Sequence, residues 1–211
     1  MLKINEIFYS IQGESSFNGM PCVFIRLTYC NLRCSYCDTE YSFYEGKDMS
    51  IDEIIHEIQK YDCKLVEVTG GEPLMQKESI ELMQTLINNK YQVMLETGGS
   101  LPINKVPKKV IKIVDFKCPT SNMAKKNDWS IIKDLNSNDE IKFVIGNRED
   151  YDWSKEKINE YNLNDKKILF SPVHDVLDSQ KLSKWILKDH LKVRLQIQLH
   201  KYIWSPETKG V

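Results

Sequence analysis

Three cysteines lie within eight residues of the chain, in the stretch TYCNLRCSYCDT, and their thiols are the clearest candidates for chemistry. They are Cys30, Cys34 and Cys37, at a C-x3-C-x2-C spacing. A structural zinc site takes four protein ligands, usually as two pairs, whereas three thiolates on an iron–sulfur cluster leave one iron with an open coordination position. An open position is typical of a reactive metal. Half a zinc knuckle or three buried thiols are the alternatives that the trio alone leaves open.

The other cysteines do not extend this motif. Clustered thiols in a reducing compartment are more often metal-binding or catalytic than disulfide-bonded. We expect the cysteines outside the trio to be core or near-core thiols; they are Cys22, Cys63 and Cys118.

The composition is that of a globular protein with one sizeable core, since 41% of the 211 residues are hydrophobic and 28% are charged. The formal net charge of −1 provides no broad basic field, so we expect a small-molecule partner and no nucleic acid. The N-terminal stretch lacks signal-peptide features, and no apolar run approaches the roughly 18 residues of a membrane span. We therefore expect a cytoplasmic chain without membrane association, forming a single domain over residues 1–211.

Apolar, β-branched runs alternate with helical patterns along the chain. One helix is expected after Ser50, because Ile51, Ile54, Ile55 and Ile58 recur at helical spacing and Glu53 completes a capping box. Further helical patterns lie around 80–87, 149–161 and 182–186. Strands are expected at 22–28, 65–69, 91–96, 110–116, 140–145, 167–170 and 193–199.

This alternation indicates parallel β–α–β units of the α/β class. The chain is too short for a complete eight-fold barrel, which takes about 250 residues, so an incomplete, TIM-like β/α barrel with mostly parallel strands is expected. Active-site residues of such barrels follow the carboxyl ends of the strands. The cysteine loop at about 29–49, GGEP at 70–73 and ETGG at 96–99 would then share one edge. The polar stretch 122–138 is expected to be a loop or a short helix.

The trio, with an aromatic Tyr36 before the last cysteine and GGEP after the next strand, resembles the signature of radical S-adenosylmethionine (SAM) enzymes. The resemblance implies a four-iron, four-sulfur cluster on the three thiolates and SAM on the fourth iron. The GGEP glycines would let the backbone approach the cofactor. For Lys117 the alternative is a solvated surface lysine without a cofactor role. The cofactor-binding residues implied are Tyr36, Cys37, Asp38, Gly70, Gly71, Glu72, Glu96, Asp115, Phe116, Lys117, Ser171, Pro172 and Val173.

Within that superfamily, IQGE at 11–14, GMPCVFIRL before the cysteines, CDT after them and the tail LHKYIWSPETKGV are similar to the 7-carboxy-7-deazaguanine synthase family. The family reaction converts 6-carboxy-5,6,7,8-tetrahydropterin to 7-carboxy-7-deazaguanine with loss of ammonia. Arg26 would hold the substrate carboxylate in a bidentate pair. The substrate-binding residues implied are Ile11, Gln12, Gly13, Glu14, Arg26, Thr69 and Val211.

The resemblance also implies Mg²⁺, a hard ion that prefers oxygen ligands, on Thr39. Two alternatives stay open: Thr39 caps a turn, or Asp38 takes the metal. IQGE is followed by Ser15 and Ser16 where many relatives place a glycine, so the loop over the pterin is expected to differ in shape. The tail at about 200–211 would fold back so that the Val211 carboxylate meets the substrate.

Other functions fit parts of the pattern. A glycyl-radical-enzyme activase shares the cysteine spacing and GGEP but acts on a partner protein, and IQGE and the tail argue against it. A non-catalytic zinc or iron–sulfur module is a second alternative, and a nucleic-acid-modifying enzyme is a third, which the lack of a basic stripe disfavours. The family resemblance further implies a homodimer and an electron donor such as flavodoxin or ferredoxin.

Overall fold

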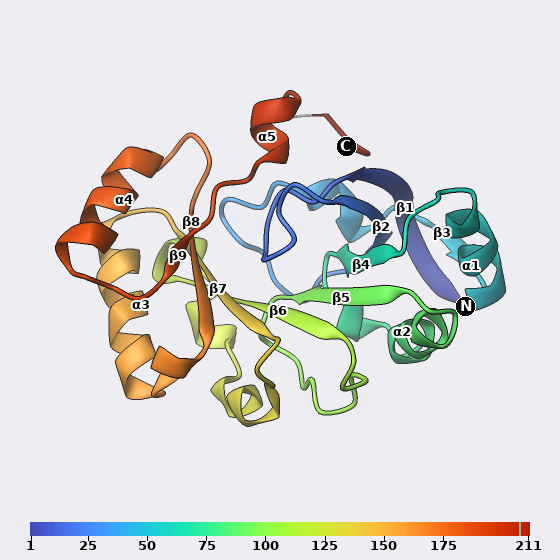
Figure 1. The fold of residues 1–211 in the computed structure, drawn as a ribbon, viewed down its shortest axis with the longest axis horizontal. Helices are drawn as coiled ribbons and strands as arrows, with labels where there is room; N and C mark the ends of the chain where they lie inside the picture. Colours follow the sequence, from blue (N-terminus) through green and yellow to red (C-terminus); the bar gives the residue numbers. More distant parts are fainter. Residues whose placement is uncertain (207) are drawn as a thin grey trace.

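The protein is built on one large sheet. This computed structural model describes residues 1–206 and 208–211, so Glu207 of the expected tail lies outside the described residues. Within that range, nine strands form a sheet in the order β3-β1-β2-β4-β5-β6-β7-β8-β9 (Figure 1). The strands are β1 (Leu2–Ile11), β2 (Pro21–Leu27), β3 (Lys47–Met49), β4 (Leu65–Gly70), β5 (Gln92–Thr97), β6 (Ile111–Phe116), β7 (Glu140–Ile145), β8 (Lys167–Pro172) and β9 (Arg194–Leu195).

From β2 to β9 every neighbouring pair of strands is parallel, and only β1 runs antiparallel to its neighbours β2 and β3. The sheet is open rather than closed, so the prediction of an incomplete β/α barrel is confirmed. The helices are α1 (Ile51–Gln59), α2 (Ser79–Asn88), α3 (Arg148–Glu160), α4 (Ser179–Lys188) and α5 (His200–Ile203). None of the helices in the described part of the chain is long and apolar enough to cross a membrane.

All seven expected strands are present, although the last is shorter than expected, at Arg194–Leu195. The strands β1 and β3 were not predicted. The alternating pattern of β1 is interrupted by a register shift between Ile4 and Glu6, which is why its sequence did not stand out. The polar stretch 122–138 forms a loop with two short 3₁₀ turns, at Ala124–Lys126 and Trp129–Asp134.

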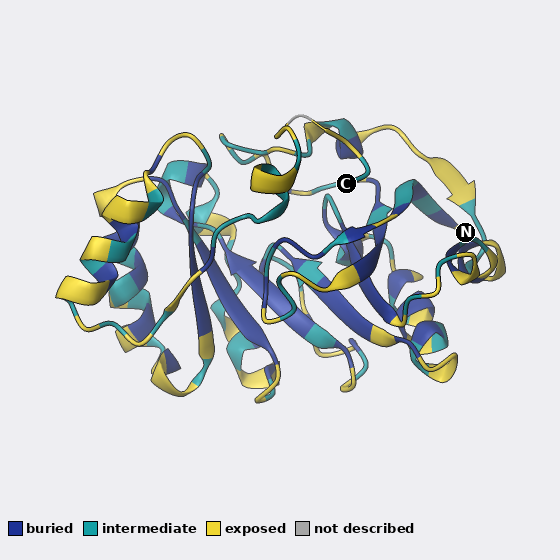
Figure 2. Ribbon diagram, turned by 45° about the horizontal axis from the view of Figure 1, so that its top comes forward, coloured by how far each residue is buried: buried dark blue, intermediate teal, exposed yellow. Residues whose placement is uncertain are grey.

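The outer face of the sheet is covered by helices. Helix α1 begins as predicted: Ser50 accepts a hydrogen bond from Glu53 N–H, and the Glu53 carboxylate accepts one from Ser50 N–H. Its buried residues Ile54 and Ile58 join one large core with Leu82 of α2. Figure 2 shows the strands buried along most of their length and the helices exposed on their outward sides.

The inner face of the sheet changes character along the strands. Near the amino ends it is apolar, and we call this cluster the base: Phe8, Cys22, Phe24, Leu65, Met94 and Ile113. Near the carboxyl ends the same face carries buried or half-buried charges, which we call the rim: Glu67, Glu96, Asp115 and Lys142. The Phe8 and Phe24 rings stack with centroids 4.9 Å apart, which closes the base.

Candidate active site

The cysteine trio lies on the loop that follows β2, at the carboxyl edge of the sheet. All six cysteines, which fall within the described residues, are free, and Cys30, Cys34 and Cys37 are each partly exposed. The start of the loop is fixed by Tyr29 N–H, which donates to Ser42 O over 3.0 Å. The predicted cluster loop is therefore ordered and open to a ligand.

The far side of the loop docks on the ends of β6 and β7. Ser35 N–H donates to Ser121 O over 3.1 Å, and Ser35 Oγ donates to Thr120 O over 2.6 Å. Tyr36 Oη donates to Val144 O over 3.4 Å, and burial raises the pKa of its phenol. The loop thus crosses the rim from β2 to β7.

The three thiols lie within electrostatic reach of one another. Burial raises the pKa of Cys34 to about 11, Lys117 opposes this rise, and the charges of Cys37 and Cys30 add to it. Among the described residues, no group of three or more His, Cys, Asp or Glu side chains is arranged to hold a metal ion. A four-iron cluster takes one thiolate per iron. The three thiols lie on one loop and are partly exposed, so they are available to a cluster, and the cluster itself stays a prediction from the family at this point.

The two glycines at the end of β4, Gly70 and Gly71, are required by the packing of the backbone as well as by the expected approach to a cofactor. A Cβ built on Gly70 would lie 2.1 Å from Leu27 O, and one built on Gly71 would lie 2.2 Å from Tyr29 O. Gly70 also has φ of +136°, a conformation that other residues rarely adopt. The space beside these glycines is therefore taken by the backbone around β2, and their approach to a cofactor stays a prediction.

Glu72 is fully buried and already engaged by the protein. Its carboxylate accepts hydrogen bonds from Leu74 N–H (3.0 Å), Thr97 Oγ1 (2.9 Å) and Gly98 N–H (2.8 Å). Burial raises its pKa, although these donors oppose the rise. Glu72 thus ties the end of β4 to the end of β5, and contact between its carboxylate and an amino group of SAM stays a prediction.

The rim is organised around Lys142 of β7. The Lys142 ammonium is paired with the carboxylates of Glu14 and Glu96, the latter at 2.6 Å, and lies 3.8 Å from Asp115 Oδ2. Burial opposes the charge of Lys142, but the carboxylates of Glu14 and Glu96 hold its pKa well above the ordinary value. Asp115 Oδ2 also accepts from Lys117 Nζ over 2.9 Å. Lys117 is therefore buried and paired, not a solvated surface lysine.

The IQGE loop joins this rim through its side chains. Gln12 donates from Nε2 to the buried carboxylate of Glu67, and its Oε1 accepts from Glu14 N–H over 2.9 Å. Burial and the nearby carboxylates of Glu96 and Glu14 raise the pKa of Glu67 well above its ordinary value. The Gln12 side chain consequently orients the loop, while Glu14 reaches Lys142.

The segment after β9 contacts the loop between β1 and β2. Leu199 N–H donates to Gly13 O over 3.0 Å, and Gln198 Nε2 donates to Glu14 Oε1 over 2.8 Å. A Cβ on Gly13 would lie 2.0 Å from the His200 ring, so only glycine permits this contact. The loop that leaves β1 and the segment that leaves β9 together form a lateral wall of the site.

The backbone at the first of the two serines after IQGE adopts a glycine-like conformation, and a difference in loop shape from relatives stays a prediction. Ser15 has φ of +61°, the left-handed region that glycine adopts more readily. Its carbonyl oxygen accepts from Arg194 Nη2 over 2.7 Å, and Ser16 N–H donates to the Glu140 carboxylate over 3.0 Å. These bonds to β9 and β7 hold the strained serine in place.

Arg26 lies on β2 beside the expected tail position. Its Nε donates to Glu6 Oε1 over 2.7 Å, and its guanidinium lies 5.9 Å from the Tyr41 ring centroid. Lys209 Nζ approaches the same Tyr41 ring to 4.2 Å. A Cβ built on Gly210 would lie 3.8 Å from Glu6 Oε2. The tail therefore folds back to the neighbours of Arg26, and Figure 1 shows the end of the chain beside β1.

Thr39 and Asp38 differ in how far they are already engaged. Thr39 precedes the 3₁₀ turn Glu40–Phe43 but makes no side-chain capping bond, and its Oγ1 lies 3.7 Å from Cys37 Sγ. Asp38 is paired with Lys201 of α5 at 2.8 Å. The Asp38 side chain is half exposed; its partial desolvation would raise its pKa, but the charge of Lys201 holds the pKa below the ordinary value.

The remaining predicted cofactor residues lie at the ends of β6 and β8. Ser171 and Pro172 belong to β8 rather than to a turn, and Val173 follows with its N–H donating to Ile145 O over 2.9 Å. The Phe116 side chain is directed into the outer core, where it stacks on Trp129 with centroids 4.3 Å apart. Only the backbone of Phe116 is therefore free to face a ligand. Thr69 is buried beside Arg26 in the sheet register.

The sequence did not point to Lys142, Glu67, Gln196 or Gln198. A charge within the apolar strand sequences EIKFVI and LVEVT was a usable signal, because a buried charge requires a partner. Gln196 has no comparable signal. It is buried, its Nε2 donates to Ile197 O over 2.8 Å, and its Oε1 has no hydrogen-bond partner among the described residues.

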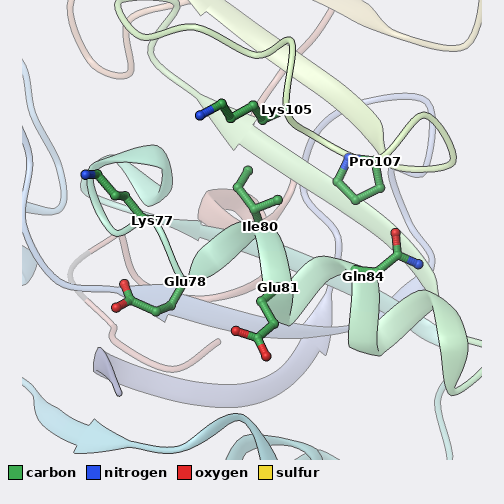
Figure 3. Close-up of a pocket in the computed structure, with 7 residues that line it drawn as sticks. All are labelled: Lys77, Glu78, Ile80, Glu81, Gln84, Lys105 and Pro107. Carbon is green, nitrogen blue, oxygen red and sulfur yellow. The ribbon is translucent and has the colours of Figure 1, made fainter.

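Two surface hollows lie away from the predicted site. One, of about 520 Å³, lies between α2 and the loop that carries Lys105 and Pro107 (Figure 3). The other, of about 570 Å³, is near the amino ends of β5 and β6. Neither is lined by any residue predicted for cofactor or substrate, so the candidate site remains the rim.

Comparison with known proteins agrees with this site. The family model of the Radical SAM superfamily matches residues 24–123, which include the trio, GGEP, Glu96 and Lys117. The 7-carboxy-7-deazaguanine synthase of Koribacter versatilis is 46% identical over 100% of both chains. The synthase of Chlorobaculum tepidum is 44% identical over 100% of this chain and 97% of its own. The chain belongs to the 7-carboxy-7-deazaguanine synthase family.

A solved structure supports the fold of this family member. The crystal structure of QueE from Escherichia coli has a TM-score of 0.78 and 24% identity, with 94% of each chain covered. At this identity the likeness concerns the fold alone.

Membership of the 7-carboxy-7-deazaguanine synthase family, with the Radical SAM match, implies a four-iron cluster and SAM as cofactors. The described thiols and the buried, unpartnered Asp115 Oδ1 are consistent with a site built to receive ligands.

Proposed function

We propose that the protein converts 6-carboxy-5,6,7,8-tetrahydropterin to 7-carboxy-7-deazaguanine, with release of ammonia, in 7-deazapurine (queuosine) biosynthesis. The observation that carries the proposal is the full-length 46% identity to a 7-carboxy-7-deazaguanine synthase. The geometry supports it, because the IQGE loop and the cysteine loop meet at one rim, where Glu14 and Glu96 share Lys142. The relatives described above are synthases, and none of them favours the activase alternative.

The chemistry divides between cofactor and protein. When bound, the reduced cluster and SAM supply a 5'-deoxyadenosyl radical that abstracts a hydrogen atom from the substrate. The protein residues bind and orient. In this proposal Cys30, Cys34 and Cys37 hold the cluster, while Glu96 and Lys117 face the SAM site. The lateral wall and the cysteine loop enclose the reacting atoms and limit access of water.

The pterin has two ends that require different partners. Its aminopyrimidinone edge presents N–H donors, which the Glu14 carboxylate and the backbone carbonyls of the IQGE loop can accept. Its carboxylate requires a cation, and Arg26 is suited to it because only its Nε is bonded to Glu6 among the described residues. Thr69 and Val211 complete the proposed pterin site from β4 and from the tail.

Magnesium belongs to the same proposal. The Thr39 hydroxyl makes no capping bond, whereas the Asp38 carboxylate is already neutralised by Lys201. These contacts favour Thr39 over Asp38 as the single protein oxygen on Mg²⁺, with substrate and water oxygens completing its shell. Because ammonia leaves from a carbon–nitrogen bond, the enzyme would be a carbon–nitrogen lyase.

The edges of the sheet bear on how the protein assembles. The edge strands β3 and β9 are three and two residues long and mostly exposed, and a second copy of the chain could cover such an edge. We therefore propose a homodimer. The reaction requires a one-electron donor such as flavodoxin or ferredoxin, and we propose a cytoplasmic location and a single domain over residues 1–211.

The test is an anaerobic assay of the reconstituted protein with reductant, SAM, Mg²⁺ and 6-carboxytetrahydropterin. The expected product has the mass of 7-carboxy-7-deazaguanine, and Cys34→Ala should abolish both the product and the bound iron. Cys63→Ala is the matched control, because Cys63 lies outside the cluster loop, with its thiol donating to Pro21 O over 3.4 Å. If the wild type forms 5'-deoxyadenosine without this product, the proposed substrate is wrong.

A further inference from the structure

We propose that Lys142 is a positioning residue that couples the pterin site to the cofactor site. The inference rests on the proposed function, because it takes Glu14 as a pterin ligand and Glu96 as a SAM ligand. Lys142 would contact neither ligand itself. It would hold the two carboxylates ionised and correctly placed for both.

The contacts place Lys142 between two segments that are far apart in sequence. Its ammonium is paired with Glu14 of the IQGE loop and with Glu96 at the end of β5. The opposite oxygen of Glu14 accepts from Gln198, which fixes that carboxylate from the other side. A movement of Glu14 or Glu96 therefore requires a movement of Lys142, so the two sites share one mechanical link.

The charges around Lys142 leave no substitute for it. The described charged or titratable groups that face it come from the cysteine loop, the IQGE loop, β4, β5, β6, the residue after β6 and α5: Asp38, Glu14, Glu67, Glu96, Asp115, Lys117 and His200. Lys117 is paired with Asp115, and burial lowers the pKa of His200. Without Lys142, the half-buried carboxylates of Glu14 and Glu96 would lie side by side with no cation in contact.

A second buried lysine provides the contrast. Lys112 lies in the neighbouring strand β6 and is paired with Asp139 at 2.9 Å, with both side chains almost fully buried. Asp139 also accepts from Lys112 N–H and Asn136 N–H, so this pair stabilises the amino end of the sheet. In the described part of the chain the partners of the Lys112 ammonium are Asp139 and Val110 O, and neither residue belongs to the proposed site. It is therefore the matched control for the loss of a buried lysine.

The test measures the affinities of the anaerobically reconstituted protein for SAM and for 6-carboxytetrahydropterin, each titrated separately by calorimetry. We expect Lys142→Met to weaken both affinities by roughly tenfold or more at pH 7, because both ligands donate hydrogen bonds to a carboxylate that has lost its cation. Lys112→Met should leave both affinities unchanged. Lys142→Arg should restore a large part of both, since the guanidinium keeps the positive charge.

A pH series separates positioning from simple loss of packing. In Lys142→Met, burial without a cation would raise the pKa of Glu14 and Glu96, so both carboxylates would be protonated at neutral pH. Raising the pH removes these protons, and both affinities should then recover. The wild type should show a smaller recovery, because Lys142 lowers the pKa of both carboxylates; it holds that of Glu14 below its ordinary value, whereas burial still leaves that of Glu96 above it. If thermal unfolding shows that Lys142→Met does not fold, the same titrations are made with Lys142→Gln.

Three outcomes would overturn the coupling. One is a loss confined to a single ligand, which would assign Lys142 to that site alone. Another is a loss without pH-dependent recovery or arginine rescue, which would make its role structural. The third is unchanged affinity for both ligands. If the wild type binds SAM but not the pterin, the proposed function fails instead, and the pH profile of SAM affinity still reports on the Lys142–Glu96 pair.

Discussion

The base and the rim occupy the same face of the same strands but differ in how they are filled. At the base, side chains such as Met94 and Ile113 exclude solvent by packing, and Met94 is 0% exposed. Two residues further along those strands, Glu96 and Asp115 carry charges, and Asp115 Oδ1 has no hydrogen-bond partner among the described residues. Packing at the base stabilises the fold. The buried charges at the rim reduce that stability, but they are available to contact a ligand.

This contrast shows how a short chain can support a reactive site. Packing of the apolar base fixes the strands. The charged residues of the rim lie further along the same strands, so the backbone that carries them is held in place without help from the rim side chains. The rim charges are mutually paired, since Lys142 meets Glu14 and Glu96 while Lys117 meets Asp115. Stability and chemistry should therefore respond to different substitutions.

The largest effect should follow from a substitution in the base. Met94→Ala would remove a fully buried side chain and should lower the free energy of unfolding by about 2–5 kcal/mol, as measured by chemical denaturation. SAM affinity at the rim should remain unchanged. Gln92→Ala on the same strand is the control, because its side chain is exposed and the expected change is within about 0.5 kcal/mol. A parallel fall in SAM affinity would show that base and rim are not separable.

An intermediate effect is expected at Glu67, and it should depend on pH. Burial and its carboxylate neighbours raise the pKa of Glu67 above the ordinary 4.5, so the folded protein keeps a proton that the unfolded chain releases. Wild-type stability should therefore fall as pH rises above 4.5, by at most about 1.4 kcal/mol per pH unit for this group. Glu67→Gln cannot ionise and removes this loss.

The measurement is the free energy of unfolding of wild type and Glu67→Gln over a pH series. The stability of the variant relative to the wild type should rise with pH until the folded Glu67 itself ionises. A difference that stays constant across the series would contradict the proton held on Glu67 in the folded state.

The smallest effect on stability is expected where the C-terminal segment covers the rim. Lys201→Met would break the pair with Asp38, whose side chain is 51% exposed, and should change the free energy of unfolding by less than about 1 kcal/mol. Cleavage by chymotrypsin at Tyr202 or Trp204 should nevertheless become faster, because the segment loses an anchor to the cysteine loop. Lys192→Met, at an exposed lysine, is the control. Equal cleavage rates in both variants would show that the pair does not hold the segment.

Local periodic signals predicted most of the fold. The parallel strands and the helix after Ser50 carry apolar spacings that few other structures satisfy, and their order placed the cysteine loop and GGEP at one edge. The N-terminal strand β1 was missed because its pairing is antiparallel and irregular at Ile4 and Glu6. No local pattern shows that such a segment adds to the edge of a parallel sheet.

The site was predicted less completely, because the spacing of residues along the chain does not show which distant segments contact one another. The two glycines of GGEP were recognised as points of close approach, but the atoms that approach them belong to the backbone near β2. The family resemblance implied Gln12 as a substrate-binding residue, yet in this structure its amide is bonded to Glu67 and to Glu14 N–H. Lys142 and Gln198 come from parts of the chain whose proximity to the IQGE loop follows only from the curvature of the sheet.

The lateral wall has a consequence for the order in which the site is made. From β4 onward, strands that are neighbours in the sheet follow one another along the chain, so the sheet can grow while a ribosome is still extending it. The cysteine loop is synthesised early, whereas the partners of Gly13 and Glu14 in the wall, Leu199 and Gln198, are synthesised near the end. The contacts that complete the wall can therefore form only after nearly the whole chain has been synthesised.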